Sequence, residues 1–246
     1  MSCCVKDIVE NLTALAPVDT AEEWDNCGLL VGDADATVDT VLVALDITPS
    51  VVDQAIKIGA QLIVSHHPVI FAPMRTFSAQ SVPYRLAVNG ISACCLHTCL
   101  DKAIGGVNDA LAARLSLHGV TVAEDGYTRI GKLNEPMKTD AFIDLVENSL
   151  QTKARFHGTR IVSTVAVVGG SGGDFIGDLL GCADAIVTGE IKHHEWLAVQ
   201  DSDCVVVEAG HFSTEHPVVE YLVTRLEQID GLKVVAATER PPYVMR

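Results

Sequence analysis

Short apolar runs and amphipathic segments alternate along the first half of the chain. DTVLVALDIT (residues 39–48) predicts a buried strand, SVVDQAIKIGA (50–60) a helix with apolar residues at 3.6 spacing, and QLIVSHH (61–67) the next strand. The alternation continues with a helix at 83–90, a strand at 91–98 and a helix at 105–117. Because a strand, a helix and a strand in this order form a βαβ unit, we expect an α/β fold with a mostly parallel sheet between helices.

The second half repeats this order of elements after an ambiguous stretch at residues 124–136. Helices are predicted at 138–150, 174–182, 192–200 and 216–229, and strands at 163–170, 183–190, 204–210 and 232–237. These patterns predict two α/β domains, with residues 1–125 in the first and residues 126–246 in the second.

The charge and the apolar runs exclude several classes of partner. The chain has 32 acidic and 17 basic residues and a formal charge of −15, which repels polyanions, so nucleic acid is an unexpected partner. No apolar run approaches the roughly 20 residues that span a bilayer, and MSCCVKDIVE lacks the basic start of a signal peptide. We expect a cytoplasmic protein without a membrane partner.

Eight cysteines are present, several of them inside apolar runs that read as strands. A free thiol in such a run behaves as a small hydrophobe. Because no CxxC pair occurs, the sequence disfavours a disulfide framework and a zinc knuckle.

Imidazole and carboxylate groups follow several predicted strands. In open α/β sheets ligands bind beyond the carboxyl ends of parallel strands, so these residues are the candidates for function. The groups are His66 and His67; His97 and Asp101; Glu190, His193 and His194; and His211 and Glu215. Such side chains on separate loops can close around one or two divalent metal ions.

Each of these residues also has an ordinary structural interpretation. A single histidine after a strand is commonly a surface or capping residue, and Asp101 could be a loop or N-cap acid. Adjacent strand residues point to opposite faces, so His66 and His67 can share a site only where the strand ends, and Pro68 favours such an end. His211 and Glu215, four residues apart, can face one point if a helix begins at Ser213 or Thr214.

The glycine-rich segment VVGGSGGDF (residues 167–175) admits two interpretations. Glycine amides at a helix start can bind phosphate. The segment fits neither GxGxxG nor GxxxxGK[ST], so a plain turn from strand to helix is favoured.

Six segments together resemble one known family, the GTP cyclohydrolase I type 2 homologues, also called the Nif-three-like proteins. In chain order the segments are EEWDNCGLLVGD, VSHHPVIF, HTCLD, TRIGKL, TGEIKHHEWLA and EAGHFSTEHPVVEYL. The combination of VSHHP with GHFSTE is specific, and the resemblance covers nearly the whole chain.

The resemblance implies a dinuclear metal site between two related α/β domains. Its implied ligands are His66, His67, Asp101, His211 and Glu215. The resemblance also implies that each half of the chain supplies one histidine to each metal. Asp101 or Glu215 would then bridge the two metals. His97 and His194 match further positions of the family and suit a role in orienting a ligand or moving a proton.

The resemblance also implies an assembly and a function. The expected assembly is a toroidal homohexamer whose sites face an inner cavity. The expected function is that of a metal-dependent hydrolase acting on a nucleotide or a similar small anionic substrate, with two divalent ions that could be zinc, iron, manganese or cobalt. The alternatives are a non-catalytic metal carrier or regulatory scaffold, and metals that only clamp the two halves.

Overall fold

The computed structural model describes residues 3–244 of the chain. The described residues form two compact units. Unit 1 contains the chain up to Gly106 together with Val218–Arg240, and unit 2 contains Val107–Pro217 and the residues from Pro241 onward. This division differs from the predicted boundary between residues 125 and 126 in two respects: unit 2 already begins at Val107, and the chain returns to unit 1 at Val218.

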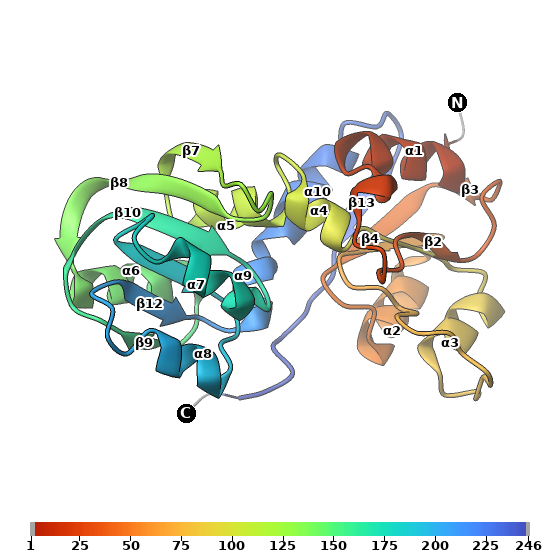
Figure 1. Cartoon of the computed structure of the whole chain (residues 1–246). Helices are drawn as coiled ribbons and strands as arrows, with labels where there is room; N and C mark the ends of the chain where they lie inside the picture. Colours follow the sequence, from red (N-terminus) through yellow and green to blue (C-terminus); the bar gives the residue numbers. More distant parts are fainter. Residues whose placement is uncertain (1–2, 245–246) are drawn as a thin grey trace. The chain divides into compact units, whose positions relative to one another are not determined.

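Unit 1 is built on a five-stranded sheet (Figure 1). Its order is β13 (Lys233–Ala236), β4 (Thr40–Ala44), β5 (Leu62–Ser65), β6 (Ser92–Cys95) and β2 (Gly28–Val31). The first four strands are parallel and β2 is antiparallel to β6. The predicted βαβ order is confirmed. The strand predicted at 232–237 joins this sheet beside β4, a pairing that local sequence patterns cannot specify.

The helices of unit 1 are α1 (Val5–Leu15), α2 (Pro49–Ile58), α3 (Val82–Val88), α4 (Thr98–Lys102) and α10 (Pro217–Leu226). Of these, α2, α3 and α10 were predicted from the periodicity, whereas α1 and α4 were not. The unit also has a short 3₁₀ turn at Val18–Thr20 and a two-stranded ribbon of β1 (Cys3–Cys4) and β3 (Thr37–Val38). Helix α2 begins where the Thr48 side chain accepts a hydrogen bond from Val51 N at 3.3 Å. It ends at Gly59, whose φ of 69° is left-handed. Figure 1 shows α2 and α3 side by side beneath the sheet, where Val52 and Leu86 enter one core.

Unit 2 is built on a six-stranded mixed sheet. Its order is β7 (His118–Val122), β8 (Arg129–Lys138), β10 (Ile161–Val168), β11 (Ala185–Thr188), β12 (Val205–Glu208) and β9 (Arg155–His157). The central strands β10, β11 and β12 are parallel, whereas the outer pairings are antiparallel. Most of the ambiguous stretch is β8, which Gly131 and Pro136 concealed because both residues are depleted in strands. Between β8 and β10 the register shifts, and Pro136 lies in that irregular part of β8.

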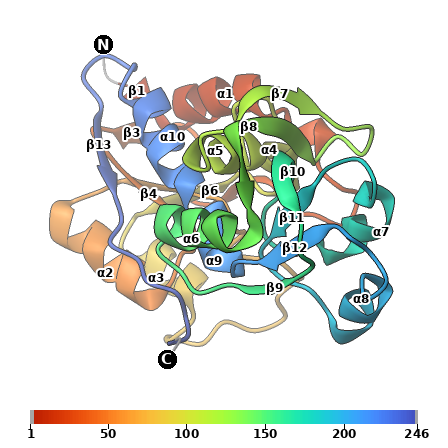
Figure 2. The same ribbon diagram turned by 90° about the vertical axis from the view of Figure 1, so that its left-hand side faces the viewer.

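Helices cover both faces of the unit 2 sheet. They are α5 (Val107–Arg114), α6 (Thr139–Leu150), α7 (Ile176–Leu179), α8 (His193–Ala198) and α9 (His211–Glu215), with a 3₁₀ turn at Gly172–Phe175. Figure 2 shows α5 and α6 on one side of the sheet and α7 and α8 on the other. Alternate residues of β10 serve the two faces, because Val165 packs with Phe142 of α6 while Ala166 packs with Ile176 of α7. The prediction of an α/β fold with helix-flanked sheets is confirmed.

Within residues 3–244, none of the helices is both long enough and apolar enough to cross a membrane.

Arg129 at the start of β8 is the largest fully buried side chain of the described residues. Its Nε lies 3.0 Å from Asp109 Oδ2, and its Nη1 donates to the carbonyl oxygens of Gly126 (3.2 Å) and Tyr127 (2.9 Å). These bonds compensate the cost of burying a guanidinium.

We expect Arg129→Met to lower the free energy of unfolding by about 3 kcal/mol, because it leaves the Asp109 carboxylate without its buried partner. Arg160→Met is the matched control, since Arg160 lies 2.8 Å from Asp184 but its side chain is 41% exposed. The control should cost less than about 1 kcal/mol. Urea unfolding of both variants measures the difference, and equal losses would contradict this account.

Candidate metal centre

His66 and His67 leave the end of β5 with their rings together rather than on opposite faces. Strand β5 ends at Ser65. The amides of both histidines still donate to the end of β4 and the residue after it, His66 N to Ala44 O at 3.3 Å and His67 N to Leu45 O at 2.9 Å. The Ser65 hydroxyl donates to His67 O at 2.8 Å and so closes the turn before Pro68. The two ring centroids are 4.7 Å apart, so the adjacent imidazoles share one side.

The Nδ1 atoms of these two rings have partners that can only accept a hydrogen bond. His66 Nδ1 lies 3.0 Å from the carbonyl oxygen of Leu96, and His67 Nδ1 lies 2.9 Å from Asp46 Oδ1. In the neutral imidazole the proton is therefore on Nδ1, which leaves a lone pair on Nε2. This is the arrangement that proteins use to orient metal-binding histidines.

Asp46 is held in place by Glu239. The two Glu239 carboxylate oxygens accept from Leu45 N at 2.7 Å and from Asp46 N at 3.0 Å. Burial raises the pKa of Glu239, and the two amides oppose that rise. A segment near the chain end thus fixes the carboxylate that orients His67.

His97 is the third imidazole of this cluster. It precedes α4, and its ring centroid lies 5.2 Å from that of His66 and 5.5 Å from that of His67. One ring nitrogen from each of the three histidines lies within 4.8 Å of the others. The sequence placed His97 outside the ligand set, whereas its distances within unit 1 would also allow it to bind a metal.

Asp25 orients His97 as Asp46 orients His67. His97 Nδ1 lies 2.8 Å from Asp25 Oδ1, and Thr98 donates to Asp25 Oδ2 from its amide at 3.0 Å. Burial raises the pKa of Asp25, but the hydrogen bonds from Thr98 and His97 outweigh it and hold this pKa well below its usual range. The pKa of His97 is lowered, first by burial and then by His66, although Asp25 opposes the shift. At pH 7 the pair is therefore a carboxylate and a neutral imidazole.

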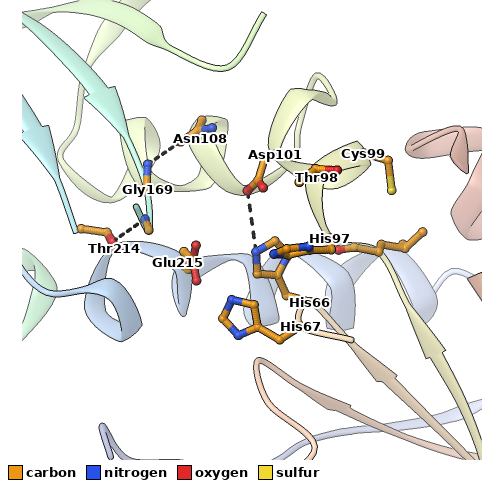
Figure 3. A network of polar contacts seen from close by, with 12 residues as sticks. His66, His67, His97, Thr98, Cys99, Asp101, Asn108, Gly169, Thr214 and Glu215 are labelled. Atoms are coloured by element: carbon orange, nitrogen blue, oxygen red, sulfur yellow. Dashed lines mark hydrogen bonds and ion pairs between the residues drawn. The ribbon is translucent and has the colours of Figure 1, made fainter. Parts of the chain in front are cut away.

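Asp101 lies on α4, one helical turn after His97. Its Oδ1 is 3.7 Å from His66 Nε2 (Figure 3). Because His66 carries its proton on Nδ1, this contact brings a lone pair and a carboxylate oxygen together. A cation at this point would interact favourably with both. Unit 1 therefore brings together all of its sequence-predicted ligands, His66, His67 and Asp101.

His211 and Glu215 occupy the first and last positions of α9 in unit 2. The helix begins at His211, before the starts at Ser213 or Thr214 that the sequence allowed, because Gly210 with a φ of 85° turns the chain directly after β12. His211 Nε2 lies 3.0 Å from Glu215 Oε2, and the Glu215 carboxylate is only 6% exposed. A nearby positive charge, such as a bound cation, stabilises a buried carboxylate of this kind.

The glycine-rich segment after β10 lets the chain pass close to α9. A Cβ atom at Gly170 would overlap the Glu215 carboxylate. Gly170 N donates to Thr214 Oγ1 at 3.1 Å, and Gly169 N donates to Asn108 Oδ1 at 2.7 Å (Figure 3). Glycine at positions 169 and 170 thus allows the chain after β10 to pass close to α9.

His193 and His194 lie on α8 of unit 2. The His194 side chain is 74% exposed, and its Nε2 is 3.9 Å from Glu195 Oε1 of the same helix. Glu190, in contrast, places Oε1 3.4 Å from His211 Nδ1. The role in proton transfer that the sequence suggested for His194 stays a prediction.

A pocket of about 340 Å³ opens beside His211 within unit 2. Its lining residues are Lys153, Arg155, Gly189, Glu190, Glu208, Gly210, His211 and Tyr243. Arg155 forms an ion pair with Glu208, and the Arg155 side chain is largely exposed. The pocket therefore combines cationic groups, carboxylates and one aromatic ring.

Sequence reasoning missed the carboxylates that orient the histidines. Asp46 follows β4, so the rule that ligands gather at strand ends would have selected it. Asp25 lies in the WDNC segment, which reads only as a turn into a strand. Each of these two carboxylates accepts a hydrogen bond from a histidine that is distant from it in the sequence.

The residues present fit a divalent metal ion. Imidazole nitrogens with fixed tautomers and nearby carboxylates are the ligands of borderline first-row metals. In unit 1 the three imidazoles and Asp101 supply such a set, and in unit 2 His211 and Glu215 are a further imidazole and carboxylate of these types.

Comparison with known proteins assigns the family. A model of the family described as Duf34/NIF3 (NGG1p interacting factor 3) matches residues 3–242. A protein of Clostridium acetobutylicum named GTP cyclohydrolase 1 type 2 homolog is 32% identical over 92% of this chain and 91% of its own length. The NGG1-interacting factor 3 of Saccharomyces cerevisiae is 30% identical over 94% of this chain and 92% of its own.

Solved structures agree with this result. The crystal structure of a hypothetical protein of Staphylococcus aureus matches with a TM-score of 0.93 and 27% identity, and covers 100% of both chains. The family that the sequence resembled is therefore confirmed, and the chain belongs to the Duf34/NIF3 family.

Proposed function

We propose that the protein binds two divalent metal ions and uses them to hydrolyse a nucleotide or a similar small anionic substrate. The proposed ligands are those that the resemblance implies: His66, His67, Asp101, His211 and Glu215. The observation that carries the proposal is the cluster of imidazoles in unit 1, whose Nδ1 atoms face oxygen acceptors. We further propose that the protein assembles as a toroidal homohexamer in the cytoplasm.

The chain's own residues would hold the ions and prepare the reaction. When bound, divalent ions acidify water and stabilise negative charge that develops on a substrate oxygen. His66 and His67 would present Nε2 lone pairs, and Asp101 would add negative charge beside His66. Asp46 would keep His67 in the binding tautomer.

His97 would accept a proton during hydrolysis. It is neutral at pH 7, because burial lowers its pKa. Asp25, at 2.8 Å from Nδ1, would stabilise the imidazolium that forms when Nε2 takes up the proton. His97 therefore has the partner that a general base needs.

The unit 2 pocket beside His211 would bind the substrate. Its volume of about 340 Å³ lies in the range of small-molecule sites, roughly 300–1,000 Å³. Lys153 and Arg155 suit an anionic group, and Tyr243 offers a ring on which a base can stack. The names of several relatives, GTP cyclohydrolase 1 type 2 homolog, are consistent with a nucleotide.

We expect His66→Ala and His211→Ala each to lower the number of metal ions bound per chain, because each removes a proposed ligand. His118→Ala is the control, since His118 is an exposed residue of β7. Elemental analysis after gel filtration measures the metal content. Binding should also weaken below about pH 6, where ordinary imidazoles become protonated. Unchanged metal content in both variants would refute the ligand set.

We expect Asp46→Asn to weaken metal binding by about 10- to 100-fold, because a neutral amide holds the His67 tautomer less firmly than a carboxylate. Competition with a chromophoric chelator measures this affinity. Asp53→Asn is the control, because Asp53 pairs with Arg85 on the surface. Equal affinities of the two variants would show that Asp46 does not orient a ligand.

The activity itself is tested on metal-reconstituted protein with a panel of nucleoside triphosphates. We expect His97→Gln to lower kcat by about 100-fold, since general-base catalysis contributes roughly 10²–10⁴-fold, and Tyr243→Leu to raise KM. Tyr84→Leu is the control, because Tyr84 is an exposed residue of α3. Metal-loaded protein that turns over no member of the panel would contradict the hydrolase and favour the non-catalytic metal carrier or regulatory scaffold.

A further inference from the structure

Two cysteine side chains of unit 1 are in direct contact. Cys27 immediately precedes β2, and Cys99 lies on α4. Their Sγ atoms are 3.7 Å apart, and both residues are free cysteines. A disulfide has an S–S distance of about 2.05 Å, so an approach of the order of 1.6 Å would join them.

The two sulfurs differ in access. Cys99 is completely buried, whereas Cys27 is partly exposed. A small oxidant can therefore reach Cys27 first, while Cys99 stays protected beside it. This difference in access is that of a reactive cysteine with a resolving partner.

Polar groups hold Cys27 toward Cys99. His97 N donates to Cys27 Sγ at 3.4 Å, and Cys27 Sγ lies 3.2 Å from Asp25 Oδ2. Cys95, another thiol near Cys27, donates to His66 O at 3.0 Å from a strand that pairs on both sides. Cys99 instead sits on a five-residue helix, which can shift more easily than a central strand.

We propose that Cys27 and Cys99 form a reversible disulfide when the protein meets a hydroperoxide. The Cys27 sulfur attacks one peroxide oxygen, the O–O bond breaks, and Cys27 sulfenic acid and water form from hydrogen peroxide. The Cys99 sulfur then attacks the sulfenic sulfur, the S–O bond breaks, and the hydroxyl leaves as water with the Cys99 proton. The two thiols lose two electrons in total, and the peroxide gains them.

The disulfide would join two segments that serve the histidine cluster. Asp25, which orients His97, is two residues before Cys27, and Asp101 is two residues after Cys99. Oxidation would thus restrain the chain on both sides of the cluster. The inference does not depend on metal binding or hydrolysis, because the reaction needs only the two sulfurs and a hydroperoxide.

The test treats the reduced, full-length protein with a small excess of hydrogen peroxide. We expect the intact mass to fall by two hydrogen atoms, and dithiothreitol to restore it. Fragmentation of the non-reduced peptides should place the bond between Cys27 and Cys99. This mapping uses the natural chain, so it does not depend on the folding of any variant.

Variants provide the matched comparison. Cys27→Ser and Cys99→Ser should each abolish the loss of two hydrogens, whereas Cys182→Ser, which removes an exposed thiol, should leave it unchanged. A bond from Cys27 to Cys95, a bond that persists in Cys99→Ser, or a gain of oxygen without a disulfide would each overturn the proposal.

Discussion

Hydrogen bonds from the Nδ1 atoms of three imidazoles are the interaction on which the candidate metal centre of unit 1 depends. A backbone carbonyl and two carboxylates accept these bonds, and none of the three can donate. The proton of each neutral ring is therefore fixed on Nδ1, and each Nε2 keeps a lone pair. Without these acceptors the rings could rotate or exchange tautomers. The short distances between the rings would then not be sufficient to form a metal-binding site.

Backbone geometry at the strand ends makes this arrangement possible. Strands β4, β5 and β6 are parallel neighbours, so Asp46, the pair His66 and His67, and His97 all follow the same edge of one sheet. In unit 2 two glycines give the backbone the geometry that positions His211 and Glu215. Gly210 turns the chain into α9, and Gly170 leaves space for Glu215.

The cysteines show how tertiary contact changes the meaning of a residue type. In the apolar runs a thiol behaves as a small hydrophobe, and fully buried Cys94 fits that description. Burial raises the pKa of Cys94 to about 12, so it stays a neutral thiol. Cys27 and Cys99 are 72 positions apart in the sequence, yet the fold brings their sulfurs to 3.7 Å. Only this contact makes a dithiol reaction conceivable.

The sequence alone determined the α/β class, the positions of most helices and strands, and the residue types that could bind a metal. Those features follow from local periodicity and from the positions of polar residues after apolar runs, which neighbours in the chain specify. Tertiary structure decided the rest. The pairing of β13 with β4, the strand β8 in a segment with glycine and proline, and the partners Asp25, Asp46 and Glu239 all depend on contacts between residues distant in sequence. Such contacts depend on how whole helices and strands pack together, so a local sequence pattern does not predict them.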